Sequence, residues 1–280
     1  MTSRVVCLLG APWHLCTLDE PLRMDVVLVC AVAFLAAGVT LFSGFGLGTL
    51  LMPIFALFFP IEVAIALTAI VHLLNNLFKL MFLGRYADRY IVLHFGVPAI
   101  LASFLGAWVL GHLSALAPLK HYGLLGHDLQ IMPVKAVVAI LLVVFTVLEL
   151  TAKGETLSFD KKYLPVGGVI SGFFGGLSGH QGALRSAFLI KCGLPKHSFL
   201  GSGVVIACLV DFARISVYGA ALPPIPSRGY LFLLLAVIAS VFAGTWVGNR
   251  LAHKLTIRTI QVIVSIMVFG IAVGLGFGLI

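Results

Sequence analysis

Long apolar runs constrain this sequence more than any single motif does. Hydrophobic residues make up 61% of the chain and charged residues only 10%, against about 25% charged in ordinary soluble domains. A soluble fold could not hydrate such a surface, whereas about 20 consecutive apolar residues are enough to cross a bilayer as a helix. The sequence therefore predicts an all-α polytopic membrane protein.

Eight apolar segments can be delimited, four in each half of the chain. They cover residues 26–59, 61–83, 91–112, 131–150, 164–190, 198–218, 229–247 and 257–280. We expect one membrane domain over residues 25–280, built from two homologous four-segment halves at about 25–151 and 163–280. Residues 1–24 mix charges with turn formers around an apolar run too short to cross, so we expect an N-terminal extension that is not part of the fold.

Polar residues recur at matching places in the two halves. The run NNLFKL at 75–80 is answered by VDFARI at 210–215, which matches Asn76 with Asp211 and Lys79 with Arg214. Within each run the two polar residues are three positions apart and would share one helix face. A Gly-rich stretch at 43–53 is likewise answered by one at 171–185. Duplicated halves with interrupted apolar segments are typical of secondary transporters.

The first segment of each half is expected to be broken or re-entrant. A straight helix over residues 26–59 would be about 50 Å long, well beyond a hydrocarbon core of about 30 Å. The glycines expected at the interruptions are Gly44, Gly46 and Gly48 in the first half and Gly176, Gly179 and Gly182 in the second. Irregular backbone at membrane depth survives only against protein or a watery cavity, and a helix that restarts there aims free N–H groups at the cavity. The alternative is that these glycines only allow close helix packing.

The distribution of positive charge favours the re-entrant arrangement. If every segment crosses, the loops on the two sides carry nearly equal numbers of Lys and Arg. If the first segment of each half turns back, one side collects Arg85, Arg89, Lys153, Lys161, Lys162, Lys191, Lys196, Arg250, Lys254 and Arg258. The other side then keeps Arg4, Arg23, Lys120, Lys135 and Arg228. This roughly twofold bias has the usual direction, and three crossings per half would make the repeats inverted.

Charged and polar residues inside the apolar runs are the candidate substrate-binding residues, because each charge at a helix centre costs about 2.5–3.5 kcal/mol on insertion scales. Arg185 is the strongest candidate, since a guanidinium can bind an oxyanion with two donors at once; its alternative is an ion pair with Asp211. The neutral donors expected around it are His72, Asn75, Asn76, Ser178, His180 and Gln181. Lys79 and Arg214 would set a positive potential or snorkel to the headgroups, and Asp211 is expected to pair with Arg214.

The sequence carries no motif for nucleotide hydrolysis, metal chemistry or covalent catalysis. It has no GxxxxGK[ST], HExxH or GxSxG pattern, and its five Cys residues lack metal-ligand spacing. We therefore expect no enzyme activity, no metal and no cofactor. The 18 Lys and Arg residues exceed the 10 Asp and Glu residues, but they mostly lie at segment ends, where membrane orientation needs them, rather than on a nucleic-acid-binding face.

Two Gly-rich runs of the sequence carry a family resemblance. The runs GFGLGTLLMPIFALFFP at 44–60 and GGVISGFFGGLSGHQGALRSAFLIKCGLP at 167–195, in a duplicated four-segment plan, resemble the TauE/SafE permeases, also called the 4-toluene sulfonate uptake permease family. The likeness covers about residues 25–280. It implies a secondary transporter in the bacterial cytoplasmic membrane that moves sulfite or organosulfonates, often outward. The chain departs from the family's three adjacent glycines in each half, which leaves the substrate open.

Other functions remain as alternatives: a passive channel, a cation-coupled exchanger, or a membrane subunit that needs a partner. A cation exchanger would be expected to place several acidic side chains inward, and Asp211 is the one convincing acid within the apolar runs. The sequence leaves open the coupling of transport to a proton or another ion, the direction of transport, and assembly into a homo-oligomer.

Overall fold

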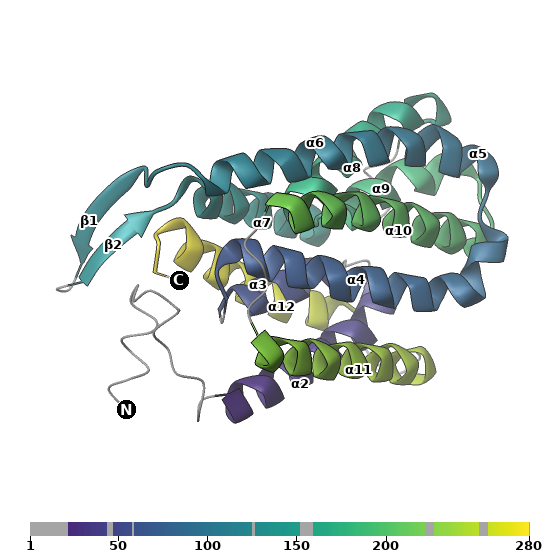
Figure 1. The fold of residues 1–280 in the computed structure, drawn as a ribbon. Helices are drawn as coiled ribbons and strands as arrows, with labels where there is room; N and C mark the ends of the chain where they lie inside the picture. Colours follow the sequence, from purple (N-terminus) through teal and green to yellow (C-terminus); the bar gives the residue numbers. More distant parts are fainter. Residues whose placement is uncertain are drawn as a thin grey trace.

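The computed structural model describes residues 22–43, 47–57, 59–124, 127–151, 159–221, 227–251 and 257–279. These residues form a bundle of helices with a β-hairpin projecting from one end (Figure 1). Among them, three helical stretches are long and apolar enough to cross a membrane: Ile61–Tyr86, Arg89–Ser114 and Lys196–Ala220. Shorter apolar helices cover Val26–Leu35, Pro133–Leu148, Leu234–Gly248 and Ser265–Gly276. The chain is thus a helical protein with the apolar helices of a multi-pass membrane protein.

The first predicted segment contains two helices that pack against each other, so it is not one straight helix. Two helices, α2 (Leu22–Ser43) and α3 (Leu47–Ala56), take the place of one, and α4 (Ile61–Leu83) follows with the bounds of the predicted segment 61–83. Gly44 and Gly46 lie outside the described residues, whereas Gly48 lies within the helix α3. Residues 1–21 also lie outside the described residues, and α2 begins slightly before the predicted start at residue 26.

The rest of the first half contains an element that the sequence did not predict. The turn η2 (Gly84–Tyr86), the short helix α5 (Arg89–Ile91) and the π-helical η3 (Val92–Gly96) lead into α6 (Val97–Ser114). Two antiparallel strands, β1 (Lys120–Leu124) and β2 (His127–Ile131), then pair with Lys120 opposite Ile131. This hairpin departs from the all-α expectation, because its short, polar strands lack a clear apolar alternation. The half ends with α7 (Pro133–Thr151).

The second half of the chain begins with a helix that stops and restarts. After η4 (Lys161–Tyr163), helix α8 (Leu164–Ser178) stops and α9 (Gly182–Leu189) restarts, followed by η5 (Ile190–Cys192), α10 (Lys196–Ala221), α11 (Ser227–Leu251) and α12 (Ile257–Gly276). Gly179 terminates α8 in the left-handed region at φ 86°, a conformation that glycine adopts without steric cost. Gly182 opens α9, but Gly176 lies inside the continuous helix α8.

Helix α9 turns back along α8, so that the two helices form a hairpin. The backbone N–H of Phe159 donates to the Ala187 carbonyl at 3.3 Å, and the Phe159 ring stacks on Phe188 with centroids 4.2 Å apart. The Phe188 ring also lies directly against Gly167, near the start of α8. The end of α9 therefore lies beside the beginning of α8, so the two helices form a hairpin, which is the geometry that a re-entrant segment needs.

Glycines along α8 allow it to pack unusually close to α6. A Cβ added to Gly172 would lie 2.1 Å from the Ala99 carbonyl oxygen, and one added to Gly176 would lie 2.1 Å from that of Ser103. Gly244 of α11 makes the equivalent backbone approach to α2. At these positions the glycines serve close helix packing, which is the alternative that the sequence left open.

Replacing Gly172 by Ala should destabilise the protein by about 1–3 kcal/mol, because the added methyl group overlaps the Ala99 carbonyl and α6 and α8 must separate. The matched control is Gly270→Ala in α12, where an added Cβ has no atom within 4 Å. The measurement is the thermal unfolding midpoint in detergent. Equal midpoints for the two variants would show that the α6–α8 contact tolerates a side chain.

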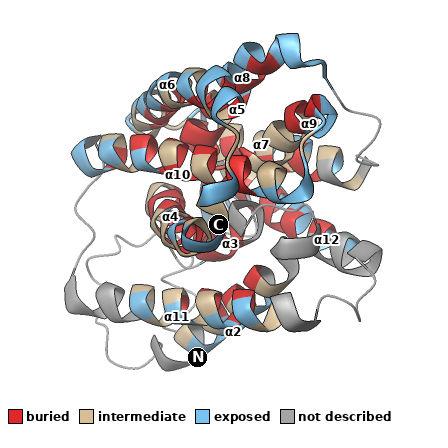
Figure 2. Cartoon of the chain, turned by 90° about the vertical axis from the view of Figure 1, so that its right-hand side faces the viewer, coloured by how far each residue is buried: buried red, intermediate tan, exposed pale blue. Residues whose placement is uncertain are grey.

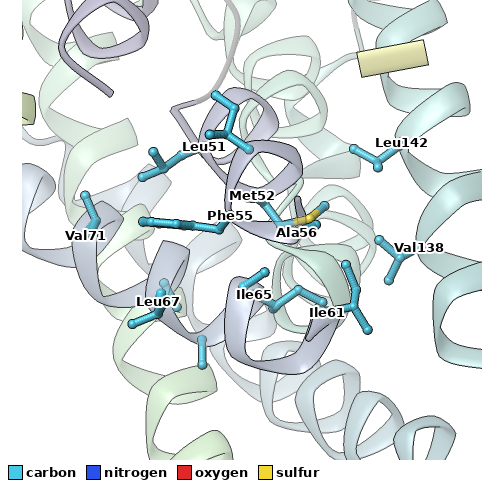
Figure 3. Close-up of a cluster of buried hydrophobic side chains, with 14 of the residues drawn as sticks. Leu51, Met52, Phe55, Ala56, Ile61, Ile65, Leu67, Val71, Val138 and Leu142 are labelled. Atoms are coloured by element: carbon cyan, nitrogen blue, oxygen red, sulfur yellow. The ribbon is translucent and has the colours of Figure 1, made fainter. Parts of the chain in front are cut away.

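The larger of two buried apolar clusters lies toward the hairpin end of the bundle, and a smaller one around Phe95 and Phe188 lies toward the opposite end. Leu51, Met52 and Phe55 of α3 are buried against α4, as Figure 3 shows around Ile65 and Leu67. Figure 2, which views the bundle from the α5 end, shows buried positions on the inward faces and exposed ones outside. Many exposed positions carry large apolar side chains, among them Met81, Phe212 and Ile266, as a lipid-facing surface requires.

The end of the bundle opposite the hairpin carries the basic loops. The Asp88 backbone N–H donates to Ser202 Oγ at 2.9 Å, and Gly168 packs on the Phe95 carbonyl, so the segment before α6 contacts the first turns of α8 and α10 there. At the other end the hairpin contacts the last residues, where Tyr122 Oη donates to the Phe277 carbonyl. We call the first end the basic end, after Arg85, Arg89, Lys161, Lys162, Lys191 and Lys196.

Candidate functional site

Buried polar side chains from three elements meet around Asp211 of α10. Asp211 and Arg214 are both 0% exposed. Asp211 Oδ1 accepts a hydrogen bond from Arg214 Nε at 3.0 Å and lies 2.8 Å from Arg214 Nη2, while Oδ2 lies 2.6 Å from His72 Nδ1 of α4. A buried carboxylate is tolerated only when charges and hydrogen bonds compensate it. This cluster supplies both.

Two amide side chains extend the cluster toward α9. Asn76 Nδ2 of α4 donates to Asp211 Oδ2 at 3.4 Å, and Gln181 Nε2 donates to Asp211 Oδ1 at 3.2 Å. The other side of the Gln181 amide, Oε1, accepts a hydrogen bond from Arg185 Nη1 at 3.3 Å. A continuous polar chain therefore runs from Arg185 on α9 through Gln181 and Asp211 to α4.

Arg214 is bound to the end of α8 as well as to Asp211. Its Nη1 donates to the Gly175 carbonyl at 3.4 Å, and Tyr218 Oη donates to the Gly176 carbonyl. These carbonyls belong to the last turn of α8, where the helix offers few acceptor partners and its dipole is negative. Arg214 Nη2, although close to Asp211, has no aligned hydrogen-bond partner. Arg214 is thus largely neutralised and holds the helix end.

Arg185 and Lys79 are cationic side chains without a carboxylate partner among the described residues. Arg185 is half-buried and lies beside Gly203 of α10, where an added Cβ would be 3.4 Å from Arg185 Nε. Lys79 is also half-buried, and the two charges repel each other. The ion pair between Arg185 and Asp211 that the sequence left open is not formed, because the ion-pair partners of Asp211 in the described residues are Arg214 and His72.

The connection from Gly179 to Gln181 exposes the beginning of α9 to this cluster. The Arg185 N–H makes the first backbone bond of the helix, to the Gln181 carbonyl at 3.0 Å. The backbone N–H groups of residues 182–184 therefore have no hydrogen-bond acceptor within the helix. The Gln181 carbonyl also accepts a hydrogen bond from Ser171 Oγ of α8 at 3.0 Å, which fixes the connection. A helix start of this kind favours an anion.

His180 and Ser178 flank the same connection. The His180 ring is 3% exposed and stacks on Phe145 of α7, with centroids 5.3 Å apart and planes 3° from parallel. Its Nδ1 lies 3.0 Å from Ser178 Oγ, and its Nε2 is buried without a hydrogen-bond partner. The ring is therefore fixed in place with one nitrogen unused.

Asn75 faces away from the Asp211 cluster. Its Oδ1 accepts a hydrogen bond from Thr245 Oγ1 of α11 at 3.2 Å, and its Nδ2 is buried without a partner. Sequence reasoning did not single out Thr245 or Tyr218, because each is a lone hydroxyl in an apolar run and only the tertiary contact gives it a role. Among the described residues, no group of His, Cys, Asp and Glu side chains is placed to hold a metal ion.

Comparison with known proteins gives one match, to a family model. The model of the family described as "Sulfite exporter TauE/SafE" matches residues 29–275, which includes every residue of the polar cluster. Neither the curated proteins nor the solved structures give a match. Because the family match spans nearly the whole chain, this protein belongs to the sulfite exporter TauE/SafE family of membrane transporters.

Proposed function

We propose that this chain is a secondary transporter that moves sulfite or small organosulfonates across the bacterial cytoplasmic membrane and binds the anion at the start of α9, beside Arg185. The observation that carries the proposal is the meeting of a re-entrant helix start with a cationic side chain that lacks a carboxylate partner among the described residues. The oxygens of a sulfur oxyanion match the forked donors of a guanidinium. Free helical N–H groups add donors without adding mobile side chains.

The charge balance of the cluster favours an anion over a cation. Asp211 is already held by Arg214 and His72, so it offers little to a cationic substrate. Arg185 and Lys79 then supply the net positive potential, and Gln181 positions the guanidinium through its Oε1. Asn76, Ser178 and His180 provide neutral polar groups near this site, whereas Asn75 is turned toward Thr245 of α11. A cation exchanger would need the opposite balance.

Inverted repeats are part of the proposal. Helix α2 packs on α11 as α8 packs on α6, and α4 with α10 and α7 with α12 pair across the halves. This pairing supports two four-segment halves in which α2 and α3 correspond to α8 and α9. With the basic end in the cytoplasm, as the positive-inside rule prefers, Arg185 lies between the break and the cytoplasmic loops. That position suits capture of an anion for export.

The test is transport by purified protein in proteoliposomes, with sulfite and methanesulfonate as substrates. Arg185→Ala should lower binding and initial flux about 10- to 100-fold, because a charge-assisted hydrogen bond contributes about 1.5–3 kcal/mol. Arg185→Lys should recover part of the loss, since it keeps the charge without the fork.

The matched control is Lys191→Ala, which removes an exposed positive charge on η5. It should transport like the unmodified protein. Wild-type flux in a folded Arg185→Ala protein would remove Arg185 from the binding site, and failure of the unmodified protein to bind either anion would overturn the proposed substrate class.

A further inference from the structure

The unused nitrogen of His180 is a buried polar atom that the proposed anion site does not yet explain. Its Nε2 has no hydrogen-bond partner, and the residue is 3% exposed. A buried polar group without a partner costs about 1–3 kcal/mol, and such groups usually mark a ligand, a water or a functional role. His180 lies two residues before α9, in the connection that leads to the free helical N–H groups.

The hydrogen bonds of the ring determine what that nitrogen can do. Ser178 Oγ donates its single hydrogen to the Phe174 carbonyl at 3.2 Å. It must therefore accept from His180 Nδ1, which lies 3.0 Å away. Nδ1 then carries the proton of the neutral ring and Nε2 presents a lone pair. A lone pair repels the oxygens of an anion, so Nε2 contacts an anion favourably only after it gains a proton.

The neighbours of His180 link that proton to the anion. From α10, the Arg214 guanidinium lies against the connection, where a Cβ on Gly179 would be 2.7 Å from Nη1. From α9, Arg185 follows one turn later, while α7 contributes the uncharged Phe145 and α8 the Ser178 hydroxyl. Asp211 is turned toward Arg214 and His72. A second proton would make the ring a cation, and the charged groups near it are then the cations Arg214 and Arg185. Their repulsion disfavours this proton unless a bound anion offsets it.

We infer that the site binds its anion together with one proton, which His180 Nε2 holds. The inference rests on the proposed anion site at the start of α9 and assigns its coupling ion. The proton comes from the water on the side where the anion binds and forms an imidazolium on His180. It then leaves with the anion on the other side, so one proton moves with each anion. A substrate that carries its own acidic proton, such as hydrogen sulfite, gives the same stoichiometry by donating to Nε2.

The experiment uses methanesulfonate, which carries no proton near neutral pH, so any proton taken up must come from solution. Binding to the purified protein is measured calorimetrically in two buffers of different ionisation enthalpy and across a pH series. About one proton should be taken up per sulfonate bound. Because binding consumes a proton, affinity should fall about tenfold for each pH unit on the alkaline side.

The decisive variant is His180→Gln, whose amide Nε2–H can replace the protonated ring nitrogen. It should bind methanesulfonate without proton uptake and with little dependence on pH. His94→Gln, at an exposed position on η3, is the control and should keep the proton uptake of the unmodified protein.

The outcomes separate the inference from the function that it deepens. Binding by the unmodified protein without proton uptake, or undiminished uptake in His180→Gln, would overturn the role of His180 and leave the anion site standing. No methanesulfonate binding at any pH would overturn both. If His180→Gln does not fold, the proton stoichiometry and pH slope of the unmodified protein still decide.

Discussion

Replacing Asp211 by Leu should destabilise the protein by about 3–5 kcal/mol, because the change leaves Arg214 as an uncompensated buried charge. Arg214 is 0% exposed, and Asp211 is its ion-pair partner in the described structure. The change also removes the acceptor of the Gln181 and Asn76 amides. Unfolding in detergent, followed by heat or by denaturant, should show the loss directly. Asp128→Leu, at an exposed position on β2, should change stability far less.

The double variant Asp211→Leu/Arg214→Met shows how much of the lost stability comes from leaving the Arg214 charge without a partner and how much from losing the ion pair itself. Buried ion pairs can often be replaced by apolar residues of similar volume with little loss, so the double variant should be more stable than Asp211→Leu alone. Part of the loss should remain, because Arg214 also donates to the Gly175 carbonyl at the end of α8. A double variant as unstable as the single one would show that the Arg214 charge is not the source of the cost.

The sequence was a good guide to the helices because their physical signals are local. Helix α4 has the predicted bounds, since Pro60 and Gly84 bracket a largely apolar run. That segment 26–59 contains more than one helix followed from its length, because a straight helix of that size exceeds the bilayer. The β-hairpin escaped prediction because its short strands pair with each other outside any apolar pattern.

The polar cluster was predictable as a set of residues but not as a set of contacts. Polar side chains inside apolar runs must find partners, which is why Asp211, Arg214 and His72 could be selected. That His72 lies 2.6 Å from Asp211, and that Arg214 also binds the end of α8, depends on how distant helices pack. The spacing of residues in the sequence does not determine that packing. An ion pair between Arg185 and Asp211 therefore could not be excluded from the sequence.

The spacing of the glycines in α8 was enough to predict which of them serve helix packing. Gly168, Gly172 and Gly176 recur every four residues, which places them on one face of a helix. That periodicity is typical of close helix packing, whereas a break needs a glycine in an unusual backbone conformation. Gly179 is the one at a positive φ in this stretch of the described chain. The break therefore lies where the backbone adopts a positive φ, and the amino-acid composition does not reveal which glycine does so.

Replacing Gly179 by Ala should destabilise the protein more than the same change at Gly193, although both glycines have positive φ. A side chain in the left-handed region costs about 1–2 kcal/mol at either position. At Gly179, φ 86°, the added Cβ would also lie 2.7 Å from Arg214 Nη1, whereas at Gly193, φ 67°, it would meet no atom within 4 Å. The extra cost at Gly179 therefore measures how firmly Arg214 is held.

Arg214 cannot move away from Gly179 without weakening its contacts to Asp211 and to the Gly175 carbonyl. We expect the difference between the two variants to be about 2 kcal/mol or more, comparable with the loss of a hydrogen bond to a charged group. The thermal unfolding midpoints of both variants are measured in the same detergent. Because both glycines have positive φ, the backbone strain is common to the two variants and cancels in the difference. If the Arg214 contacts carry the cost, adding Arg214→Met should relieve Gly179→Ala and leave Gly193→Ala unrelieved. Equal behaviour of the two glycines would mean that the guanidinium yields freely, and the end of α8 would then need another source of its stability.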